Sequence, residues 1–403
     1  MSFETMLFGE CANLVRSSTL PSLYPDSPYI ALEHINQATL NLNGYAYGRD
    51  ADSQKTKFSK GDILFGKLRP YFRKVVIAPF DGLCSTDIWV VRPKGGIDRN
   101  FLFYWMASEE FINRSTDTSE GTRMPRAKWE VVSKFATPML HIDEQREIGA
   151  TLRSLDDRIA LLRETNTTLE AIAQALFKSW FVDFDPVRAK QEGREPEGMD
   201  ADTAALFPDS FEESELGLVP IGWKVGTLQD LLVLQRGFDL PTSNRIPGKY
   251  PIIAASGPSG THNISMATGP GVITGRSGVL GRVFLELNDY WPLNTSLWVK
   301  EFRRAKACYA YELLRLLDFA SFNAGSAVPT LNRNHIHSLK YTLPSATCIS
   351  AYEEIAMKLH QRVKSNKEHA QTLVDIRDSL LPRLISGQLR LPEAETLLEE
   401  VGS

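Results

Sequence analysis

The sequence predicts an α+β protein in which two similar domains are separated by a pair of long antiparallel coiled-coil helices, an internal repeat with pseudo-two-fold symmetry. Two observations lead to this fold class. Short motifs recur in the same order, about 207 residues apart, along a chain of 403 residues. Each copy also ends in a long stretch whose apolar residues follow heptad spacing. An antiparallel pair is favoured because parallel helices would crowd both domains at one end.

The repeat is carried by short segments that match between the two halves of the chain. Solenoid repeats are much shorter than this period, so the matches indicate two copies of one larger unit. Their order and nearly constant offset make a chance origin a poor explanation. The matched segments are residues 61–67 with 270–276, residues 85–90 with 294–299, and residues 121–125 with 325–329.

Each copy is expected to contain one mixed domain followed by one long helix. Short apolar stretches bounded by Gly and Pro indicate strands. The expected strands cover residues 62–65, 74–78, 88–91, 271–274, 281–286 and 297–300, and a recurring helix covers residues 101–111 and 307–319. The regions are a first domain (1–142), a first helix (143–185), an acidic linker (186–222), a second domain (223–346), a second helix (347–390) and a tail (391–403).

The long helices are predicted from apolar residues that recur at alternating spacings of four and three. Proline is absent from residues 143–184 and 346–381, and Asp143 and Ser350 are suitable N-caps. An Asn interrupts each apolar seam, which favours two helices packed on each other over an ordinary core helix. The predicted seam positions are Ile148, Leu155, Leu162, Asn166 and Leu169 in the first helix and Ile355, Leu359, Asn366 and Leu373 in the second.

The segment between the copies is strongly acidic. Residues 191–215 contain nine Asp and Glu residues and one basic residue, Arg194. This composition predicts a solvated connector that phosphates would repel. At the end of the first helix, Trp180, Phe181 and Phe184 are expected to be exposed and to favour a partner protein.

Composition excludes several classes of protein. Hydrophobic residues make up 43% and charged residues 23%, as in an ordinary globular protein, and no apolar run approaches the ~18 residues of a membrane helix. The first residues lack the pattern of a secretory signal, and the four cysteines form no CxxC pair, so a cytoplasmic location is expected. The net charge of −4 means that any binding of nucleic acid must come from local patches.

The most basic stretch is residues 55–74, where seven Lys and Arg residues accompany a single acid, and Tyr71 and Phe72 lie among the basic residues. It surrounds a turn that follows a predicted strand and matches residues 275–282 of the second copy. A charge run is usually a solvated face, but loops on a rigid sheet commonly carry recognition groups. The candidate DNA-binding residues here are Lys57, Lys60, Lys67, Arg69, Tyr71 and Arg73, with Arg276, Ser277 and Arg282 in the second copy.

Two further pairs of matched segments contain polar candidates. Arg can donate to O6 and N7 of guanine, and Asn, Ser and Thr can reach several bases. For Thr86, a hydroxyl satisfied by the backbone is an equally good interpretation. The copies share frame residues but differ at these positions, as expected of two domains that read different sequences. The candidates are Thr86, Arg123 and Arg126 in the first copy and Asn294, Asn332 and Arg333 in the second.

Catalytic motifs are missing from the sequence. A GxxxxGK[ST] nucleotide loop, an Asn-Pro-Pro-aromatic tetrad and a GxSxG nucleophile elbow are all absent. His335 and His337 form the only close histidine pair, and without a third ligand nearby a chance pair is the better interpretation. We therefore expect no metal or cofactor in this chain, and we expect any catalysis to belong to partner proteins.

Taken together, these residues resemble the specificity (S) subunits of type I restriction–modification systems. The resemblance covers nearly the whole chain, and the turn of the second copy matches the family loop better than the turn of the first. It rests on the duplicated plan and on residues 61–69, the Gly-Thr-x-x-Pro-like segments at Gly121 and Gly325, the helix openings at residues 143–148 and 350–355, and residues 176–186, 220–223 and 380–389.

The resemblance implies that each target-recognition domain reads one half of a bipartite site in double-stranded DNA, while the helices set the spacer. It also implies partners: usually two methyltransferase (M) subunits, which bind S-adenosylmethionine and methylate adenine at N6, and restriction (R) subunits for cleavage. This chain would then have no catalytic residue of its own. Two alternatives remain open, a coiled-coil adaptor that reads no DNA and a DNA enzyme with an unrecognised site.

Overall fold

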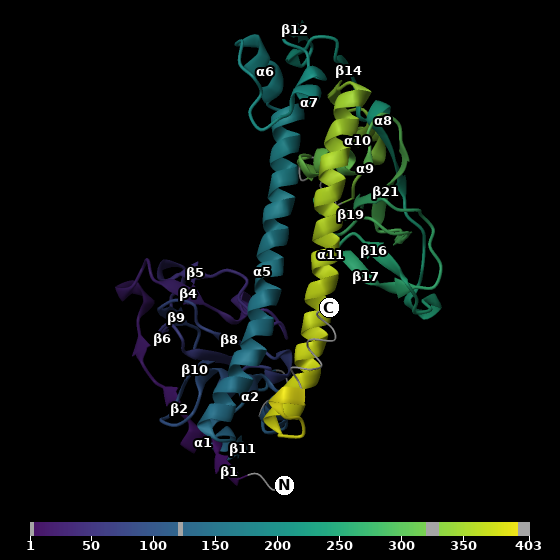
Figure 1. Ribbon diagram of the computed structural model, residues 1–403. Helices are drawn as coiled ribbons and strands as arrows, with labels where there is room; N and C mark the ends of the chain where they lie inside the picture. Colours follow the sequence, from purple (N-terminus) through teal and green to yellow (C-terminus); the bar gives the residue numbers. More distant parts are fainter. Residues whose placement is uncertain (1–3, 120–123, 320–329, 394–403) are drawn as a thin grey trace. The chain divides into compact units, whose positions relative to one another are not determined.

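The computed structural model describes residues 4–119, 124–319 and 330–393 (Figure 1). It divides into two compact units, of which unit 1 comprises Met1–Leu162 with Glu368–Ser403 and unit 2 comprises Arg163–Lys367. Two long helices, α5 (Ile142–Phe181) and α11 (Ala346–Ile385), each contribute residues to both units. Each unit is therefore one domain together with a part of both helices. Within the described residues, no helix is long and apolar enough to span a membrane.

Unit 1 is built on two small sheets. The central antiparallel sheet has the order β2-β10-β7-β8, and the second sheet has the order β3-β6-β9-β4-β5 with one parallel pair, β4 and β9. The strands are β1 (Glu4–Leu7), β2 (Ala12–Val15), β3 (Ser18–Thr19), β4 (Pro28–Ile30), β5 (Ala46–Tyr47), β6 (Lys55–Phe58), β7 (Ile63–Gly66), β8 (Val75–Ile77), β9 (Gly82–Cys84), β10 (Ile88–Pro93) and β11 (Ala136–Met139), which pairs with β1.

The central sheet of unit 1 is buried on both faces because its residues alternate between two apolar clusters. Ile63 and Phe65 pack with helix α2, whereas Leu64 between them packs with Phe58 and Ile88 of the opposite face. The helix expected at residues 101–111 is two helices, since Ser108 is extended and caps the second one. The helices are α1 (Phe8–Cys11), α2 (Arg99–Ala107), α3 (Glu109–Asp117) and α4 (Trp129–Val132).

Unit 2 repeats this architecture, which confirms the internal repeat. Its central antiparallel sheet has the order β15-β21-β18-β19, the same relative order as in unit 1, and β14 pairs with β22 as β1 pairs with β11. The strands are β14 (Lys224–Thr227), β15 (Leu232–Arg236), β16 (Tyr250–Ala254), β17 (Gly257–His262), β18 (Gly271–Gly275), β19 (Val283–Glu286), β20 (Trp291–Pro292), β21 (Ser296–Phe302) and β22 (Lys340–Leu343), and the helices are α8 (Leu228–Leu231), α9 (Ala307–Arg315) and α10 (Arg333–His337).

Within each unit the helices α5 and α11 run antiparallel, as the sequence predicts. In unit 1, Ile148 and Leu152 share a cluster with Leu384, while Ile159 shares one with Ala370. In unit 2, the side-chain amide of Asn366 donates to the side-chain oxygen of Asn166 at 2.9 Å, and both residues are buried. The two predicted Asn residues therefore meet each other across the seam.

The predicted seam needs one correction. Ile355 is 38% exposed, and its neighbours Tyr352 and Ala356 are buried instead. The aromatic ring of Tyr352 packs against Phe177 and Trp180 of α5, so it takes the inward position that a strict heptad assigns to Ile355. The remaining predicted positions are buried or half-buried: Ile148, Leu155, Leu162, Asn166, Leu169, Leu359, Asn366 and Leu373.

The predicted N-caps are also wrong by a few residues. Helix α5 begins at Ile142, so Asp143 lies in its first turn, where the positive end of the helix dipole stabilises a carboxylate. Helix α11 begins at Ala346, and the hydroxyl of Ser345 accepts from the amide of Cys348 at 3.2 Å, which is the capping contact assigned to Ser350. Its other end continues through Pro382 to Ile385.

The acidic segment is folded onto unit 2 rather than being a solvated connector. Its apolar residues Val187, Phe207 and Val219 are buried, and Val187 and Phe207 share a cluster with Trp180 and Phe181, which are therefore not exposed. The acidic residues correctly predicted an exposed surface for this segment, but the prediction did not account for the apolar residues between them. Its elements are α6 (Asp185–Gln191), α7 (Ala201–Ala205) and the hairpin of β12 (Phe211–Ser214) and β13 (Gly217–Pro220).

The Asn166–Asn366 pair predicts how the seam responds to substitution. Replacing Asn166 alone by Leu leaves the buried amide of Asn366 without its partner, so we expect the free energy of unfolding to fall by about 1–3 kcal/mol. Replacing both by Leu removes the buried polar groups together and is expected to restore most of that loss. Urea unfolding of the full chain measures both effects, with the exposed Thr167→Ala on the same helix as control. A double variant less stable than the single one contradicts this explanation.

Candidate nucleic-acid interface

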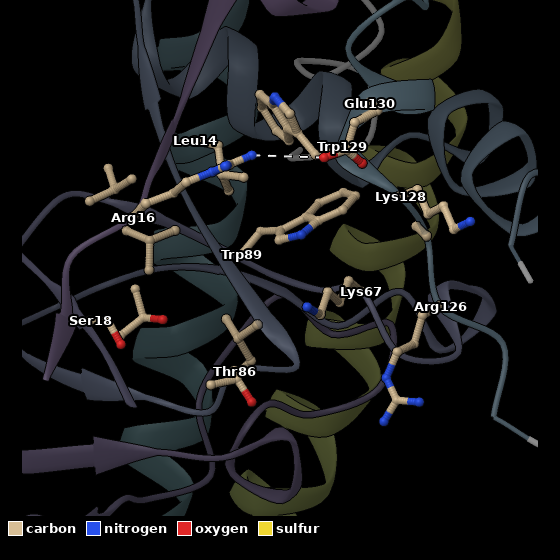
Figure 2. A pocket seen from close by; sticks show the side chains of 15 residues that line it. Leu14, Arg16, Ser18, Lys67, Thr86, Trp89, Arg126, Lys128, Trp129 and Glu130 are labelled. Atoms are coloured by element: carbon tan, nitrogen blue, oxygen red, sulfur yellow. Dashed lines mark ion pairs between the residues drawn. The ribbon is translucent and has the colours of Figure 1, made fainter. Parts of the chain in front are cut away.

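A surface groove of about 600 Å³ lies over the central sheet of unit 1 (Figure 2). Four basic side chains line it, and the only acid among the lining residues is Glu130, whose carboxylate lies 3.8 Å from Arg16. The basic residues are Arg16, Lys67, Arg126 and Lys128, and two tryptophans, Trp89 and Trp129, line the groove with them. Trp89 is buried and Trp129 is half-buried, so it is the four basic side chains that suit a polyanion at this surface.

The groove brings together three of the sequence-predicted residues, Lys67, Thr86 and Arg126, from three separate segments (Figure 2). Backbone hydrogen bonds fix those segments. The amide of Lys67 donates to the carbonyl of Asp87 at 2.9 Å, and the carbonyl of Lys67 accepts from the amide of Ala127 at 3.0 Å. The segments around residues 67, 86 and 126, each selected from the repeat, therefore form one surface.

The positive charge of Arg126 is stabilised by the carboxylate of Asp87. Its Nε donates to Asp87 at 2.9 Å and its Nη2 donates to the second oxygen of that carboxylate at 3.3 Å. These hydrogen bonds and the negative charge of Asp87 raise the pKa of Arg126 above its ordinary value. Asp87 therefore uses part of the hydrogen-bonding capacity of the Arg126 guanidinium, although the Arg126 side chain is 43% exposed.

Unit 2 carries the same backbone frame at the matched positions. The amide of Arg276 donates to the carbonyl of Thr295 at 2.9 Å, and the carbonyl of Arg276 accepts from the amide of Leu331 at 2.8 Å. Ser277 forms a bridge with Thr330, as Leu68 does with Arg126 in unit 1. The predicted residues Arg276, Ser277, Asn294, Asn332 and Arg333 all belong to the segments of this frame or directly follow them.

Other predicted residues lie outside the groove. Lys57 lines a separate hollow of about 410 Å³, where its ammonium group lies 3.8 Å from the ring centroid of Tyr24. Lys60, Arg69 and Tyr71 are exposed on the same domain, and half of the Tyr71 side chain is accessible. These positions remain predictions as DNA contacts.

Several predicted residues have partners within the protein. Arg73 is a correction, because its guanidinium is only 19% exposed and is bound to Ala107 and Asp378. Asn294 donates to Asp239, Arg282 donates to the carbonyl of Ser256 at 3.1 Å, and Asn332 caps α10. Arg123 lies outside the described residues.

Sequence reasoning missed Arg16 and Trp129 as groove residues, whereas Lys128 belongs to the candidate segment of residues 121–128 that also contains Arg126. Arg16 follows β2, and residues 8–16 resemble residues 228–236, a stretch that ends in Arg236, so the sequence contained a signal for Arg16. No sequence signal marked Trp129, because an aromatic residue next to a basic one is common in a protein core. Of the histidine pair, His337 is buried and its Nε2 accepts from the amide of Leu234 at 2.9 Å, which satisfies it structurally without a metal.

Comparison with a family model finds a match over residues 10–171, described as "Type I restriction modification DNA specificity domain". This range covers the domain of unit 1 and most of α5. The matched region includes the whole groove, from Arg16 to Glu130.

Among curated proteins, the chain is 27% identical to the type I restriction enzyme HindI specificity subunit of Haemophilus influenzae, over 83% of this chain and 88% of that protein. It is 22% identical to the MjaIX specificity subunit of Methanocaldococcus jannaschii, over 83% of this chain and 79% of the relative. It is also 32% identical to the EcoDI specificity subunit of Escherichia coli, over 43% of this chain and 41% of the relative.

Among solved structures, the model matches the type I restriction–modification S subunit of M. genitalium. The match has a TM-score of 0.60 at 15% identity and covers 95% of this chain and 96% of that one. At this identity the match establishes the fold alone, and the choice of contact residues rests on the geometry described above.

Proposed function

Since the chain is a specificity subunit of a type I restriction–modification system, we propose that its two repeated domains each read one half of a bipartite target in double-stranded DNA. One observation supports this most strongly. The backbones around Lys67 and Arg276 share two hydrogen bonds and one bridge, with one acceptor shifted by a single residue between the copies, while the side chains they present differ. A shared frame with different side chains is what two readers of different sequences require, because base edges are distinguished by donor and acceptor pattern.

The groove of unit 1 fits a DNA backbone and its bases. Lys67 and Arg16 are placed for phosphate contact, which gives affinity and register, and Arg126 and Thr86 offer donors for base edges. In unit 2, Arg276 takes the position of Lys67. The net charge of −4 does not oppose this assignment, because residues 191–215 alone contain nine acidic residues and one basic residue.

We assign the helices α5 and α11 a second role, in spacing the half-sites and docking the partner subunits. The proposed partners are methyltransferase subunits, usually two, and restriction subunits. Methyl transfer to adenine N6 and the binding of S-adenosylmethionine would occur on the methyltransferase subunits, so this chain would act without a catalytic group. The support for this division is the absence of catalytic motifs in the sequence together with the family to which the chain belongs.

Charge reversal in each frame tests the two-reader proposal. In the full chain with its partners, Lys67→Glu is expected to weaken binding to one half-site by about 10- to 100-fold, because a contact to DNA becomes a repulsion. Arg276→Glu is expected to weaken binding to the other half-site only. Binding to duplexes with either half scrambled measures the effect, and methylation mapping in cells with and without the gene supplies the target sequence. The exposed Lys358→Glu on α11 is the control.

The alternatives give different results in the same experiment. A coiled-coil adaptor that reads no DNA would leave half-site preference unchanged in both variants. A DNA enzyme with an unrecognised site would methylate or cleave a duplex when purified without partners. Either result contradicts the proposed function.

A further inference from the structure

The turn that follows β7 has an unusual backbone. The short helix η4 (Pro70–Phe72) is flanked by Arg69 and Arg73, which have left-handed φ angles of 52° and 48°. Residues with a side chain rarely adopt this conformation and keep it only where surrounding contacts hold them. The loop that presents Lys67, Arg69 and Tyr71 is therefore held in shape by its neighbours.

Arg73 provides the principal side-chain anchor of this loop. Its Nε donates to the carbonyl of Ala107, at the end of α2, at 2.6 Å. Its Nη2 donates to Oδ1 of Asp378, on α11, at 3.3 Å. The loop is thus tied at its far end both to its own domain and to a long helix.

Asp378 is itself fixed by a buried network. Its Oδ1 also accepts from Nε and Nη2 of Arg377 at 3.1 Å and 2.9 Å. Arg377 is 1% exposed and donates through Nη1 to Asp156 of α5 at 2.5 Å, and Asp156 accepts from the hydroxyl of Tyr104 at 2.6 Å. Charge-assisted hydrogen bonds therefore connect both helices to the loop without a break.

Among the described residues of unit 2, the matching loop has no such connection to the long helices. The repeat places Arg282 at the position of Arg73, and its guanidinium donates to the carbonyl of Ser256 within the domain. The helices α5 and α11 align at an offset of 204 residues, which places Gln174, an exposed residue of α5, at the position of Asp378. The link between helix and loop is a feature of unit 1, so unit 2 serves as an internal control.

We propose that Arg73 and Asp378 are positioning residues for DNA reading, through which the helix pair holds the loop that presents Lys67, Arg69 and Tyr71 to one half-site. The inference rests on the proposed function of that loop. Oδ1 of Asp378 already accepts from Arg73 and Arg377, and its negative charge is repelled by phosphates, so Asp378 acts through Arg73 and not by contact with DNA. Arg73 in turn acts by fixing the loop backbone and not by contact with DNA.

The test compares Arg73→Ala, Asp378→Asn and the double variant in the full chain with its partners. The probes are the wild-type target duplex and duplexes with either half scrambled, and Lys67→Glu identifies the half read by unit 1. Each single variant is expected to lower the ratio of target to scrambled affinity for that half about tenfold, and the double variant is expected to lose no more than the larger single loss. The ratio for the other half is expected to stay unchanged. Asp375→Asn, an exposed acid on the same helix, is the matched control.

The salt dependence separates positioning from contact. If Arg73 bound a phosphate, its removal would lower the slope of log affinity against log salt by about one unit, and Asp378→Asn would strengthen binding by removing a negative charge. That pair of results overturns the inference, whereas an unchanged slope with weakened reading in both variants supports it. Arg73→Lys keeps the charge and the left-handed backbone position but loses the planar fork, so it is expected to show a partial loss.

Failure of the inference and failure of the proposed function give different outcomes. A wild-type complex with no half-site preference contradicts the proposed function. A wild-type complex with preference, combined with an Asp378→Asn variant that keeps it, contradicts the positioning role alone. Thermal unfolding of each variant shows whether the domain remains folded, and if Arg73→Ala unfolds, the Arg73→Lys and Asp378→Asn results decide.

Discussion

Insertion of one heptad into each long helix is expected to abolish binding to the native target by more than about 100-fold. The insertions are placed between Leu162 and Arg163 and between Lys367 and Glu368, where the chain passes from one unit to the other. Seven residues add about 10 Å to a helix, or about three base pairs of duplex. The heptad keeps the seam in register, but three base pairs turn one half-site to a different face of the DNA, so both half-sites cannot be read together.

Insertion of three heptads provides the matched control for that loss. It adds about 32 Å, which is close to one turn of duplex DNA, so the half-sites return to nearly the same face. We expect this variant to bind a target whose spacer is nine or ten base pairs longer. Binding to a series of duplexes that differ only in spacer length measures both variants. An unchanged spacer preference would show that the helices do not set the spacing.

Replacement of Arg377 by Ala is expected to cause the largest loss of stability, about 3–5 kcal/mol, because it leaves the carboxylates of Asp156 and Asp378 without their buried partner. Burial alone would lower the pKa of Arg377, but the two carboxylates outweigh it and raise that pKa. The residue is therefore a fixed positive charge in the core of unit 1. The exposed Arg383→Ala on the same helix is expected to change the unfolding free energy by less than about 0.5 kcal/mol.

Urea unfolding of the full chain measures the loss at Arg377. The companion variant Asp156→Asn with Arg377→Met removes the charge together with one carboxylate and is expected to recover part of it. If Arg377→Ala unfolds at the same urea concentration as the wild type, the buried network does not stabilise unit 1. In that case a contact other than the one with Arg377 would have to hold Asp378 in position.

The repeat could be predicted from the sequence because the residues that the two copies share are those that the backbone geometry requires. Lys67 and Arg276 were aligned by offset alone, and the structure shows the same two backbone hydrogen bonds around each. Three strands of each central sheet and both long helices were found for the same reason, since apolar runs and heptad spacing follow from the periods of strand and helix. The side-chain partners of Asn166 and Asn366 were foreseeable because both interrupt an apolar seam.

The errors come from contacts between residues far apart in the chain. Arg73 lies in a basic run, and nothing in that run shows that Asp378, 305 residues later, binds its guanidinium. The acidic segment was assigned to solvent from its charges, although Phe207 and Trp180 pack together. Ile355 was placed in the seam because a local pattern cannot show that Tyr352 fills the space.

The division of the chain into units has a consequence for biosynthesis. Unit 2 is one continuous stretch, Arg163–Lys367, whereas unit 1 is completed only by residues near the carboxyl terminus. Leu380, Leu381 and Leu384 share the cluster that contains Ile148, Leu152 and Phe101, so a nascent chain leaves this apolar surface open until those leucines have been synthesised. The domain of unit 1 precedes unit 2 in the chain but is completed after it, and premature termination before residue 368 would release a chain prone to aggregation.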